Sequence, residues 1–188
     1  MSKKNTILLL ADGAEEMEAV ITIDILRRAE IDVTIASIID QECIKCSRNV
    51  KICADAKLEA VKDKQYDAVI LPGGLAGSKA LSNSKEVGDL LKKQETEGRL
   101  IAAICAAPTA LKAHGIGFGK QITSYPSMKD QLIGDYKYLE DVVVTDGNII
   151  TSRGPATAFA FGLTIVEKLL DKTSALNVAK GMLYKDYE

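Results

Sequence analysis

The chain has 188 residues, of which 47% are hydrophobic and 27% charged, and this composition suits one globular domain over residues 1–188. The net charge of -2 and the lack of a basic run argue against nucleic-acid and anionic-membrane partners. The first apolar run stops at Asp12, which is too short for a secretory signal or a membrane span. We therefore expect an intracellular protein whose four cysteines are mostly reduced thiols.

The predicted elements alternate between buried strands and amphipathic helices. In chain order, we expect a strand at 5–11, a helix at 14–30, a strand at 31–38, short strands or a hairpin at 42–55, a strand at 66–74, a helix at 85–98, a strand at 99–105, a short helix at 108–115, a hairpin at 142–152 and helices at 156–170 and 174–185. The short helix begins with proline and ends at glycine, which is the expected polarity.

Strand–helix alternation of this kind predicts an α/β fold, a doubly wound and mainly parallel sheet with helices on both faces. Ligands bind such sheets outside the carboxyl ends of the strands, at a switch in strand order. Three loops are expected there: "DGAEE" at 12–16, "PGGLAGS" at 72–78 and "CAAP" at 105–108. We therefore expect the functional residues of the protein to lie in these three loops.

The glycines of "HGIGFGKQ", residues 114–121, superficially resemble a phosphate loop. The third glycine of a dinucleotide fingerprint is out of place. A Walker loop would need glycine at His114 and Ser or Thr at Gln121. We interpret these glycines as helix-ending and turn residues.

Cys43 and Cys46 have the spacing of a redox or zinc motif. A thioredoxin-type pair would begin a helix, whereas this pair lies in a strand-like segment. Tetrahedral zinc would need two more ligands, and only Cys53 is near. We expect these three residues to be small buried or edge thiols, with a stress-induced disulfide as the alternative, and we predict no metal site.

His114 is the single histidine of the chain. It follows Cys105 by nine residues along the helix that the cysteine introduces, which is about 13 Å along the axis. It therefore cannot be the base of a Cys–His dyad, and a cation at a helix C-terminus is its simpler role. This argues against a protease-type hydrolase.

Cys105 lies in "AICAA", with small residues two positions before and after it. The spacing parallels G-x-S-x-G, the nucleophile elbow, in which a strained strand-to-helix turn presents the side chain. Pro108 then begins the helix. A thiol here would face unpaired N–H groups and the positive end of the helix dipole, both of which favour the thiolate. The alternative is that Cys105 only fills space in a tight bend.

Gly73 and Gly74 end the strand expected at 66–74. Glycines there let backbone N–H groups approach a ligand and form an oxyanion site. The alternative is a tight turn with no ligand.

Glu15, Glu16 and Glu18 open the first helix, where acids complement the helix dipole. Helical spacing turns one of them inward, and we expect Met17 or Val20 beside it. A carboxyl in such an apolar crevice would have a raised pKa and could donate a proton.

Five segments together resemble the DJ-one family, the Parkinson-disease-associated branch of the ThiJ/PfpI superfamily: "GAEEME", "LPGG", "AAICAAPTAL", "SYPSMK" and "TSRGPATAFAF". The resemblance covers essentially the whole chain in order, and "LIAAICA" and "TSRGP" are quite specific to this branch. It implies a flavodoxin-like fold, a homodimer and no cofactor, in the cytoplasm with the nucleus and mitochondrion as further compartments.

The resemblance also implies roles for individual residues. The reactive cysteine matches Cys105, and the acid that hydrogen-bonds it matches Glu18. The backbone groups that bind a carbonyl oxygen match Gly74 and Ala106.

Further positions match an anion-binding patch beside the thiol. These are Arg48, with Glu15 as a neighbour, together with the partner subunit's Arg28 and Pro155. The dimer face of the family corresponds to the first helix, around 17–28, and to the segment near Phe159.

Two classes of function are compatible with this resemblance. In the first, the protein is an enzyme that converts 2-oxoaldehydes such as methylglyoxal to hydroxy acids without glutathione, or repairs early glycation adducts. In the second, it is a redox sensor whose cysteine is oxidised to a sulfinic acid and which binds client proteins as a redox-dependent chaperone. A poised thiol serves both, so the sequence leaves the two open.

The chain departs from part of the family at two positions. Tyr125 stands where some relatives have a histidine near the cysteine, and a phenol is a poor base near neutral pH. Cys43 is an extra thiol beside Cys46, which leaves disulfide chemistry there open.

Overall fold

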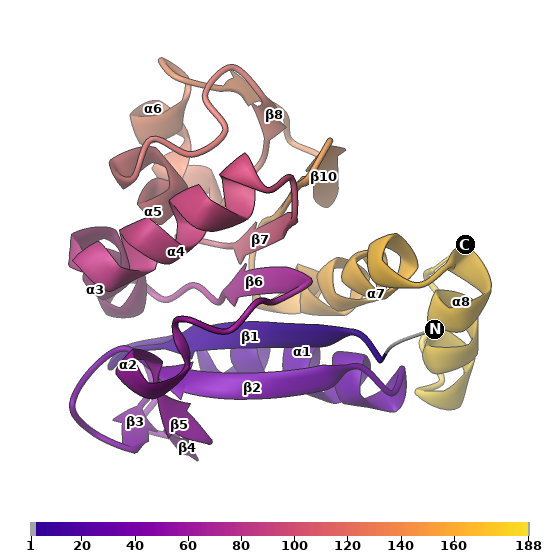
Figure 1. Cartoon of the computed structure of the whole chain (residues 1–188). Helices are drawn as coiled ribbons and strands as arrows, with labels where there is room; N and C mark the ends of the chain where they lie inside the picture. The colour runs from indigo at the N-terminus through magenta and orange to yellow at the C-terminus, as the bar shows by residue number, and fades with distance from the viewer. Residues whose placement is uncertain (1–2, 188) are drawn as a thin grey trace.

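A seven-stranded sheet forms the centre of the computed structural model, which describes residues 3–187 (Figure 1). Its strands in spatial order are β10 (Val143–Asp146), β11 (Ile149–Ser152), β7 (Leu100–Ile104), β6 (Ala68–Leu71), β1 (Asn5–Leu10), β2 (Asp32–Ser37) and β5 (Ala56–Lys57). Neighbouring strands pair in parallel, except for the β10–β11 hairpin. The predicted mainly parallel α/β sheet is confirmed.

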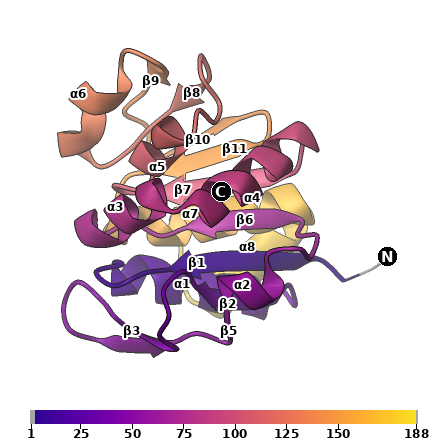
Figure 2. The same ribbon diagram turned by 60° about the vertical axis from the view of Figure 1, so that its left-hand side comes forward.

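Helices lie on both faces of this sheet. They are α1 (Glu16–Arg28), α2 (Leu58–Val61), α3 (Leu75–Asn83), α4 (Lys85–Thr96), α5 (Pro108–Ala113), α6 (Lys129–Leu132), α7 (Ala158–Leu169) and α8 (Lys172–Gly181). Helices α1 and α7 pack against each other on the face away from the viewer in Figure 1, whereas α2 and α4 lie in front, and the turned view in Figure 2 agrees. Within residues 3–187, no helix has the length and apolar character needed to cross a bilayer.

The central strands β6 and β7 are apolar along their whole length, and β1 is apolar from Ile7 onward, because helices cover both faces of the sheet. Leu8, Leu9 and Leu10 of β1 are fully buried, as are all residues of β6 and Ile101 to Ile104 of β7. This core fixes the three strand ends that carry the predicted loops.

The order of the strands brings those loops together. The chain passes from β1 to β2 on one side and from β6 to β7 on the other, so the switch in strand order lies between β1 and β6. The carboxyl ends of β1, β6 and β7 are therefore adjacent, and the loops at 12–16, 72–78 and 105–108 meet there as predicted.

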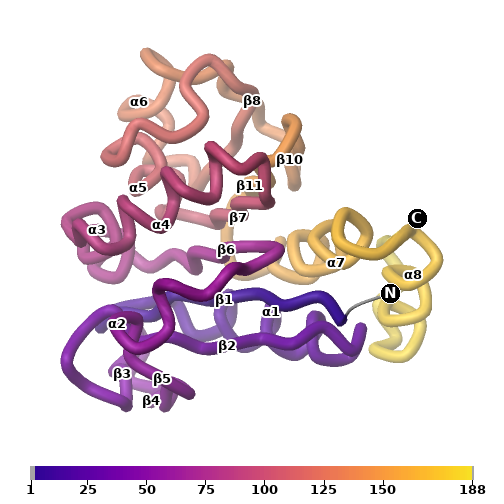
Figure 3. The backbone as a smooth tube through the Cα atoms, in the orientation of Figure 1, coloured from indigo at the N-terminus to yellow at the C-terminus, as the bar shows by residue number. Residues whose placement is uncertain are grey.

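Several smaller elements complete the fold. The predicted hairpin at 42–55 consists of β3 (Cys43–Lys45) and β4 (Lys51–Cys53). A second small pair, β8 (Gln121–Ile122) with β9 (Lys137–Tyr138), and two 3-10 helices, η1 (Pro126–Met128) and η2 (Pro155–Thr157), were not predicted. Figure 3 shows the irregular run from α5 to β10 at the top of the molecule.

The segment at 72–78 is only partly a loop, which corrects the prediction. Helix α3 begins at Leu75, directly after Gly74. Gly74 is its N-cap, so the backbone turns from strand to helix within three residues.

Candidate active site

Cys105 occupies a sharp turn between β7 and α5. Its φ is +64°, a left-handed conformation that non-glycine residues seldom adopt and that stores strain. The backbone holds this turn through bonds from the Cys105 N–H to the Ser152 carbonyl (3.0 Å) and from the Tyr125 N–H to the Cys105 carbonyl (2.8 Å). The side chain is 9% exposed. The predicted elbow is confirmed.

Gly73 lies against this elbow so closely that no side chain fits. A Cβ at Gly73 would lie 2.5 Å from the Cys105 Cβ, 2.6 Å from Glu18 Oε2 and 2.9 Å from the Ile104 carbonyl oxygen. Gly74 has a φ of +85°, and a Cβ there would lie 2.1 Å from the Gly13 carbonyl oxygen. Gly73 thus brings the loop after β6 against Cys105, and Gly74 brings the same loop against the loop after β1.

Glu18 is the acid that α1 turns inward, and it is fully buried. Its Oε2 accepts a 2.8 Å hydrogen bond from the Gly73 N–H, whereas Oε1 is buried and makes no hydrogen bond. Burial raises the pKa of Glu18 to about 7, although the Gly73 N–H and the Cys105 thiol partly oppose this and the charge of Glu15 adds to it. The carboxyl is therefore protonated for part of the time at neutral pH, as its inward position led us to predict.

The predicted neighbours of this acid are wrong. Met17 and Val20 are 51% and 49% exposed, so they lie on the outer side of α1. The groups around the Glu18 carboxyl are Gly73 and Cys105. A helix turns by about 100° per residue, so residues 17 and 20 face away from residue 18.

The Cys105 sulfur also faces two backbone donors. The N–H groups of Gly74 and Ala106 both interact with it and lower its pKa. Burial and an ionised Glu18 outweigh them and raise the pKa of the thiol to about 12. The predicted effect of the N–H groups is therefore confirmed in direction, but it does not set the net pKa of the thiol. In this desolvated space the thiolate forms when Glu18 holds the proton.

The other two acids of α1 stabilise its start. Glu15 is the N-cap, and its carboxylate accepts from the Glu18 N–H at 2.8 Å. Glu16 accepts from the Ser47 hydroxyl (2.8 Å) and the Arg48 N–H (2.7 Å). Burial opposes ionisation of Glu16, but these bonds and those from its own backbone and Val50 exceed it and lower its pKa. Glu15 thus positions Glu18, and Glu16 holds the hairpin.

The residues predicted for an anion-binding patch are not gathered within one chain. Arg28 lies at the far end of α1, about 15 Å along the axis from Glu18, and pairs with Asp24 at 2.5 Å. Arg48 is exposed beside the hairpin turn, and Pro155 is half-buried at the start of η2. Phe159 stacks on Tyr184 at the start of α7.

Tyr125 lies next to the elbow, since its N–H donates a hydrogen bond to the Cys105 carbonyl. Its ring is 45% exposed and lies against Gly154, where a Cβ would be 3.5 Å from the ring. A groove nearby is lined by Leu75, Ala106 and Met128, of which the first two directly follow Gly74 and Cys105 in the chain.

His114 does not serve Cys105. It is the C-cap of α5, with Nε2 2.9 Å from the Leu81 carbonyl oxygen, and its ring fills the space that a side chain at Gly88 would need. The exclusion of a Cys–His dyad within the chain therefore stands.

The prediction for the remaining cysteines is corrected. Cys43 and Cys53 are joined by a disulfide across the β3–β4 hairpin, so they are not free thiols. Cys46 is free and buried, and burial followed by the charges of Glu16, Glu15 and Asp12 raises its pKa to about 11. Across residues 3–187, no three His, Cys, Asp or Glu side chains gather in a way that could hold a metal ion.

Sequence reasoning missed two contributions to this site. Gly73, rather than Gly74, binds the Glu18 carboxyl, and Ser152 accepts the Cys105 N–H. Gly73 lies in "LPGG" and Ser152 in "TSRGP", so the sequence indicated that both segments matter. Only the strand register assigns each backbone group its partner.

Comparison with known proteins agrees with this geometry. The profile of the DJ-1/PfpI family matches residues 4–168. The chain belongs to the DJ-1/PfpI family. Drosophila melanogaster protein dj-1beta is 55% identical over 181 residues, covering 96% of this chain and 97% of the fly protein. The Parkinson disease protein 7 homolog of Danio rerio is 52% identical over 189 residues, covering 99% of this chain and all of the fish protein.

Two further similarities concern structure and activity. The crystal structure of Drosophila melanogaster DJ-1beta has a TM-score of 0.96 at 54% identity, covering 98% of this chain and all of that one. A Caenorhabditis elegans protein named glutathione-independent glyoxalase DJR-1.2 is 44% identical over 177 residues, covering 93% of this chain and 94% of the worm protein. The family therefore includes a member named as a glutathione-independent glyoxalase.

Proposed function

We propose that this protein is a glutathione-independent glyoxalase that uses Cys105 as its nucleophile. The observation that carries the proposal is the convergence on one sulfur of a fully buried Glu18 carboxyl and the N–H groups of Gly74 and Ala106. A nucleophile, a proton carrier and an oxyanion site are the groups that addition to an aldehyde requires. The name of the worm relative supports the same substrate class, 2-oxoaldehydes or adducts derived from them.

The reaction begins when the Cys105 thiolate adds to the aldehyde carbon of a 2-oxoaldehyde. Glu18, which took the thiol proton, donates it to the new oxyanion that the Gly74 and Ala106 N–H groups stabilise. Glu18 then moves the C–H proton of the hemithioacetal carbon to the neighbouring carbon, and the hemithioacetal hydroxyl proton passes to the neighbouring carbonyl oxygen, so that a 2-hydroxy thioester forms. Water hydrolyses the thioester, releasing a hydroxy acid such as lactate and restoring the thiol.

Lactate formation from methylglyoxal, in buffer without glutathione or other aldehyde scavengers, tests this proposal. Cys105→Ser should abolish turnover, and Glu18→Gln should lower it by about 10²- to 10⁴-fold. Cys46→Ser removes a buried thiol that lies outside the elbow and should retain turnover. Equal rates in the wild type, Cys105→Ser and Glu18→Gln would refute the proposal.

A second candidate function is redox sensing by Cys105. The same N–H groups and a protonated Glu18 can hydrogen-bond a sulfinate, which is the product of two successive oxidations of a thiolate. The oxidised form would then bind client proteins. After mild peroxide, two added oxygens should appear on the tryptic peptide 100–112, and in Glu18→Gln this product should be lost. Oxygen addition at Cys46 instead would count against it.

We further propose a homodimer formed through α1. Met17 and Val20 are exposed apolar side chains on this helix, and Arg28 lies too far from Cys105 to act within one chain. In a dimer, the partner subunit's Arg28 and Pro155 would join Arg48 in an anion-binding patch beside the sulfur. Sedimentation equilibrium of the wild type and Val20→Asp would test this. A monomeric wild type would contradict it.

A further inference from the structure

The β3–β4 hairpin places its two cysteines side by side. The register pairs Cys43 with Cys53, Ile44 with Ile52 and Lys45 with Lys51. Backbone bonds join residues 42 and 54 and residues 46 and 50, so Cys43 and Cys53 form a non-hydrogen-bonded pair, the position at which facing side chains lie closest. Their Cα atoms are 3.9 Å apart. The strand register thus selects Cys53, rather than the nearer Cys46, as the partner of Cys43.

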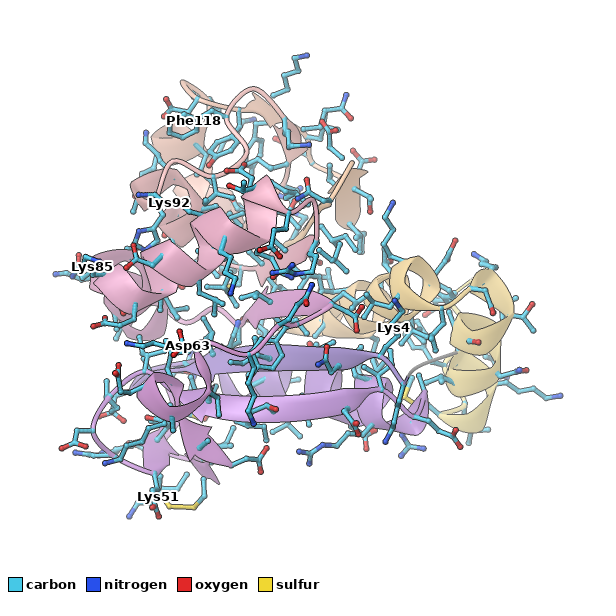
Figure 4. The ribbon with its side chains drawn as sticks, viewed as in Figure 1. Lys4, Lys51, Asp63, Lys85, Lys92 and Phe118 are labelled. Carbon is cyan, nitrogen blue, oxygen red and sulfur yellow. A yellow bond between two sulfur atoms is a disulfide. The ribbon has the colours of Figure 1, made fainter. Side chains whose placement is uncertain are left out.

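This pair is open to reagents in solution. Cys43 and Cys53 are both exposed, whereas Cys46 and Cys105 are buried. Figure 4 shows the yellow bond between the two sulfur atoms beside Lys51 at the bottom of the molecule. An exposed disulfide can be attacked by an incoming thiolate, which is the property of labile and regulatory disulfides.

The charge beside the pair favours one class of reagent. Side chains two residues apart on a strand share a face, so Lys45 and Lys51 lie on the same face as Cys43 and Cys53. All four side chains are exposed, and neither lysine forms a salt bridge with another group among residues 3–187. Their positive charge stabilises hairpin thiolates and attracts anionic reagents.

The hairpin is also fastened to the loop that positions Glu18. The Gly13 N–H bonds the Lys45 carbonyl at 2.8 Å, and the Lys45 N–H bonds Asp12 Oδ1 at 2.9 Å. The Ser47 N–H bonds the Ala14 carbonyl at 2.9 Å. With the two bonds to Glu16, these contacts hold both sides of residues 12–16.

That loop leads directly to the elbow. The Glu15 N–H bonds the Gly73 carbonyl at 3.0 Å, and the Glu15 carboxylate caps the Glu18 N–H. Gly73 in turn donates to the Glu18 carboxyl. A continuous run of hydrogen bonds therefore joins the hairpin to the acid that shares its proton with Cys105.

We propose that Cys43 and Cys53 form a reversible dithiol–disulfide centre, separate from Cys105, that exchanges with anionic low-molecular-weight thiols and disulfides and sets how firmly Glu18 is held. In the oxidising direction, the Cys43 thiolate attacks a small disulfide and releases one small thiolate, forming a mixed disulfide. The Cys53 thiolate then attacks the Cys43 sulfur and releases the second. The hairpin loses two protons and two electrons, and the small disulfide is reduced to two thiols.

Peptide mapping tests the pairing. Trypsin separates the three hairpin cysteines, because Lys45, Arg48 and Lys51 lie between them. After equilibration with oxidised glutathione and blocking of free thiols, peptides 29–45 and 52–57 should be joined and peptide 46–48 should be blocked. A Cys43–Cys46 link or a Cys53 link between two chains would overturn the proposal.

The charge of the reagent tests the role of the lysines. Changing Lys45 and Lys51 together to Gln should slow reduction of the disulfide by glutathione about two- to fivefold at low salt and leave reduction by the neutral thiol 2-mercaptoethanol unchanged. Equal slowing by both reagents, or no slowing by either, would overturn this assignment.

The rate at which iodoacetamide alkylates Cys105, read on peptide 100–112, tests the link to the elbow without relying on turnover. Opening the disulfide should slow this rate about two- to tenfold, the effect of loosening one hydrogen bond. Cys43→Ser and Cys53→Ser should each show the slow rate under all conditions, whereas Cys46→Ser should keep the redox dependence. Equal rates in oxidised and reduced wild type would overturn the link, whether or not the protein turns over methylglyoxal.

Discussion

The elbow around Cys105 and the β3–β4 hairpin both present sulfur, but they control it differently. At the elbow, the sulfur is buried against Gly73 and its ionisation depends on whether Glu18 holds a proton. On the hairpin, Cys43 and Cys53 are exposed, and each has the other as its partner. Burial makes the first thiol sensitive to a nearby charge, whereas exposure makes the second pair sensitive to reagents in solution.

The two regions meet in one turn of α1. Glu16 and Glu18 are two residues apart, yet the pKa of Glu16 is lowered and that of Glu18 is raised to about 7. Glu16 faces hydrogen-bond donors of the hairpin, whereas Glu18 faces a desolvated space with one backbone donor. The same side chain therefore becomes a fixed anion or a proton carrier according to the groups around it.

The largest effect should come from filling the space at the elbow. Gly73→Ala should lower the free energy of unfolding by about 3 kcal/mol, because the new methyl group collides with Cys105, Glu18 and the Ile104 carbonyl. Urea unfolding measures it. Gly134→Ala, where nothing lies within 4 Å, is the control and should change stability by no more than about 0.5 kcal/mol. A similar small change for Gly73→Ala would show that the elbow is loosely packed.

The next effect is a dependence of stability on pH. Folded Glu18 keeps its proton up to about pH 7, whereas its ordinary pKa is 4.5, so the folded chain binds more protons between these values. Its contribution to stability is present below pH 4.5 and is lost as pH rises towards 7, by roughly 3 kcal/mol in all. The stability difference between wild type and Glu18→Gln, measured by urea unfolding from pH 4 to 8, should show this fall.

Glu16→Gln provides the opposite control. Its lowered pKa means that Glu16 stabilises the fold above its unfolded pKa and that this contribution is lost as pH falls. The difference between wild type and Glu16→Gln should therefore grow as pH rises. If both variants gave the same slope, the contrast between the two acids would be wrong.

The hairpin disulfide should have a somewhat smaller effect on stability. Closing a loop with a sequence separation of 10 restricts the unfolded chain and contributes roughly 2–3 kcal/mol. Unfolding of the oxidised protein should therefore occur at higher urea than that of Cys43→Ser/Cys53→Ser, and reduction should remove the difference. A difference that persisted after reduction would belong to the serine substitutions and not to the cross-link.

The smallest effect concerns the cap that lies between the two regions. Glu15→Ala should lower the free energy of unfolding by about 1 kcal/mol, because the Glu18 N–H loses its acceptor at the start of α1. Glu15→Asp keeps an acceptor at the N-cap and should recover most of this stability, together with the alkylation rate of Cys105. If Glu15→Asp restored neither the stability nor the alkylation rate of Cys105, Glu15 would not act as a cap.

Much of the fold followed from local patterns. The strand at 5–11, the helix at 14–30 and the strand at 99–105 were predicted within a few residues, because apolar spacing reports which face of an element is buried. Helix α3 was missed, because "LAGS" is short, rich in small residues and directly follows two glycines. The β8–β9 pair was missed because two-residue strands have no periodicity to detect.

The site was predicted in outline and corrected in detail. The elbow at Cys105 has a local signature, since small neighbours and Pro108 are needed for the turn itself. The N–H groups of the elbow lower the pKa of the thiol as predicted, but the net pKa is raised, because burial and the charge of Glu18, a residue far away in the chain, exceed their effect. The predicted neighbours of Glu18 were wrong because Met17 and Val20 lie on the outer side of α1, whereas the groups that face its carboxyl, Gly73 and Cys105, come from distant loops.

The sequence by itself determined the order of the elements, the elbow and the family, since each is written in residues close together or in quoted motifs. Only the tertiary structure decided that Glu18 faces Gly73, that Glu16 faces the hairpin, and that Cys43 pairs with Cys53 instead of Cys46. Periodicity shows that a side chain points inward, but its partner depends on strand order and register, which arise from contacts between distant segments.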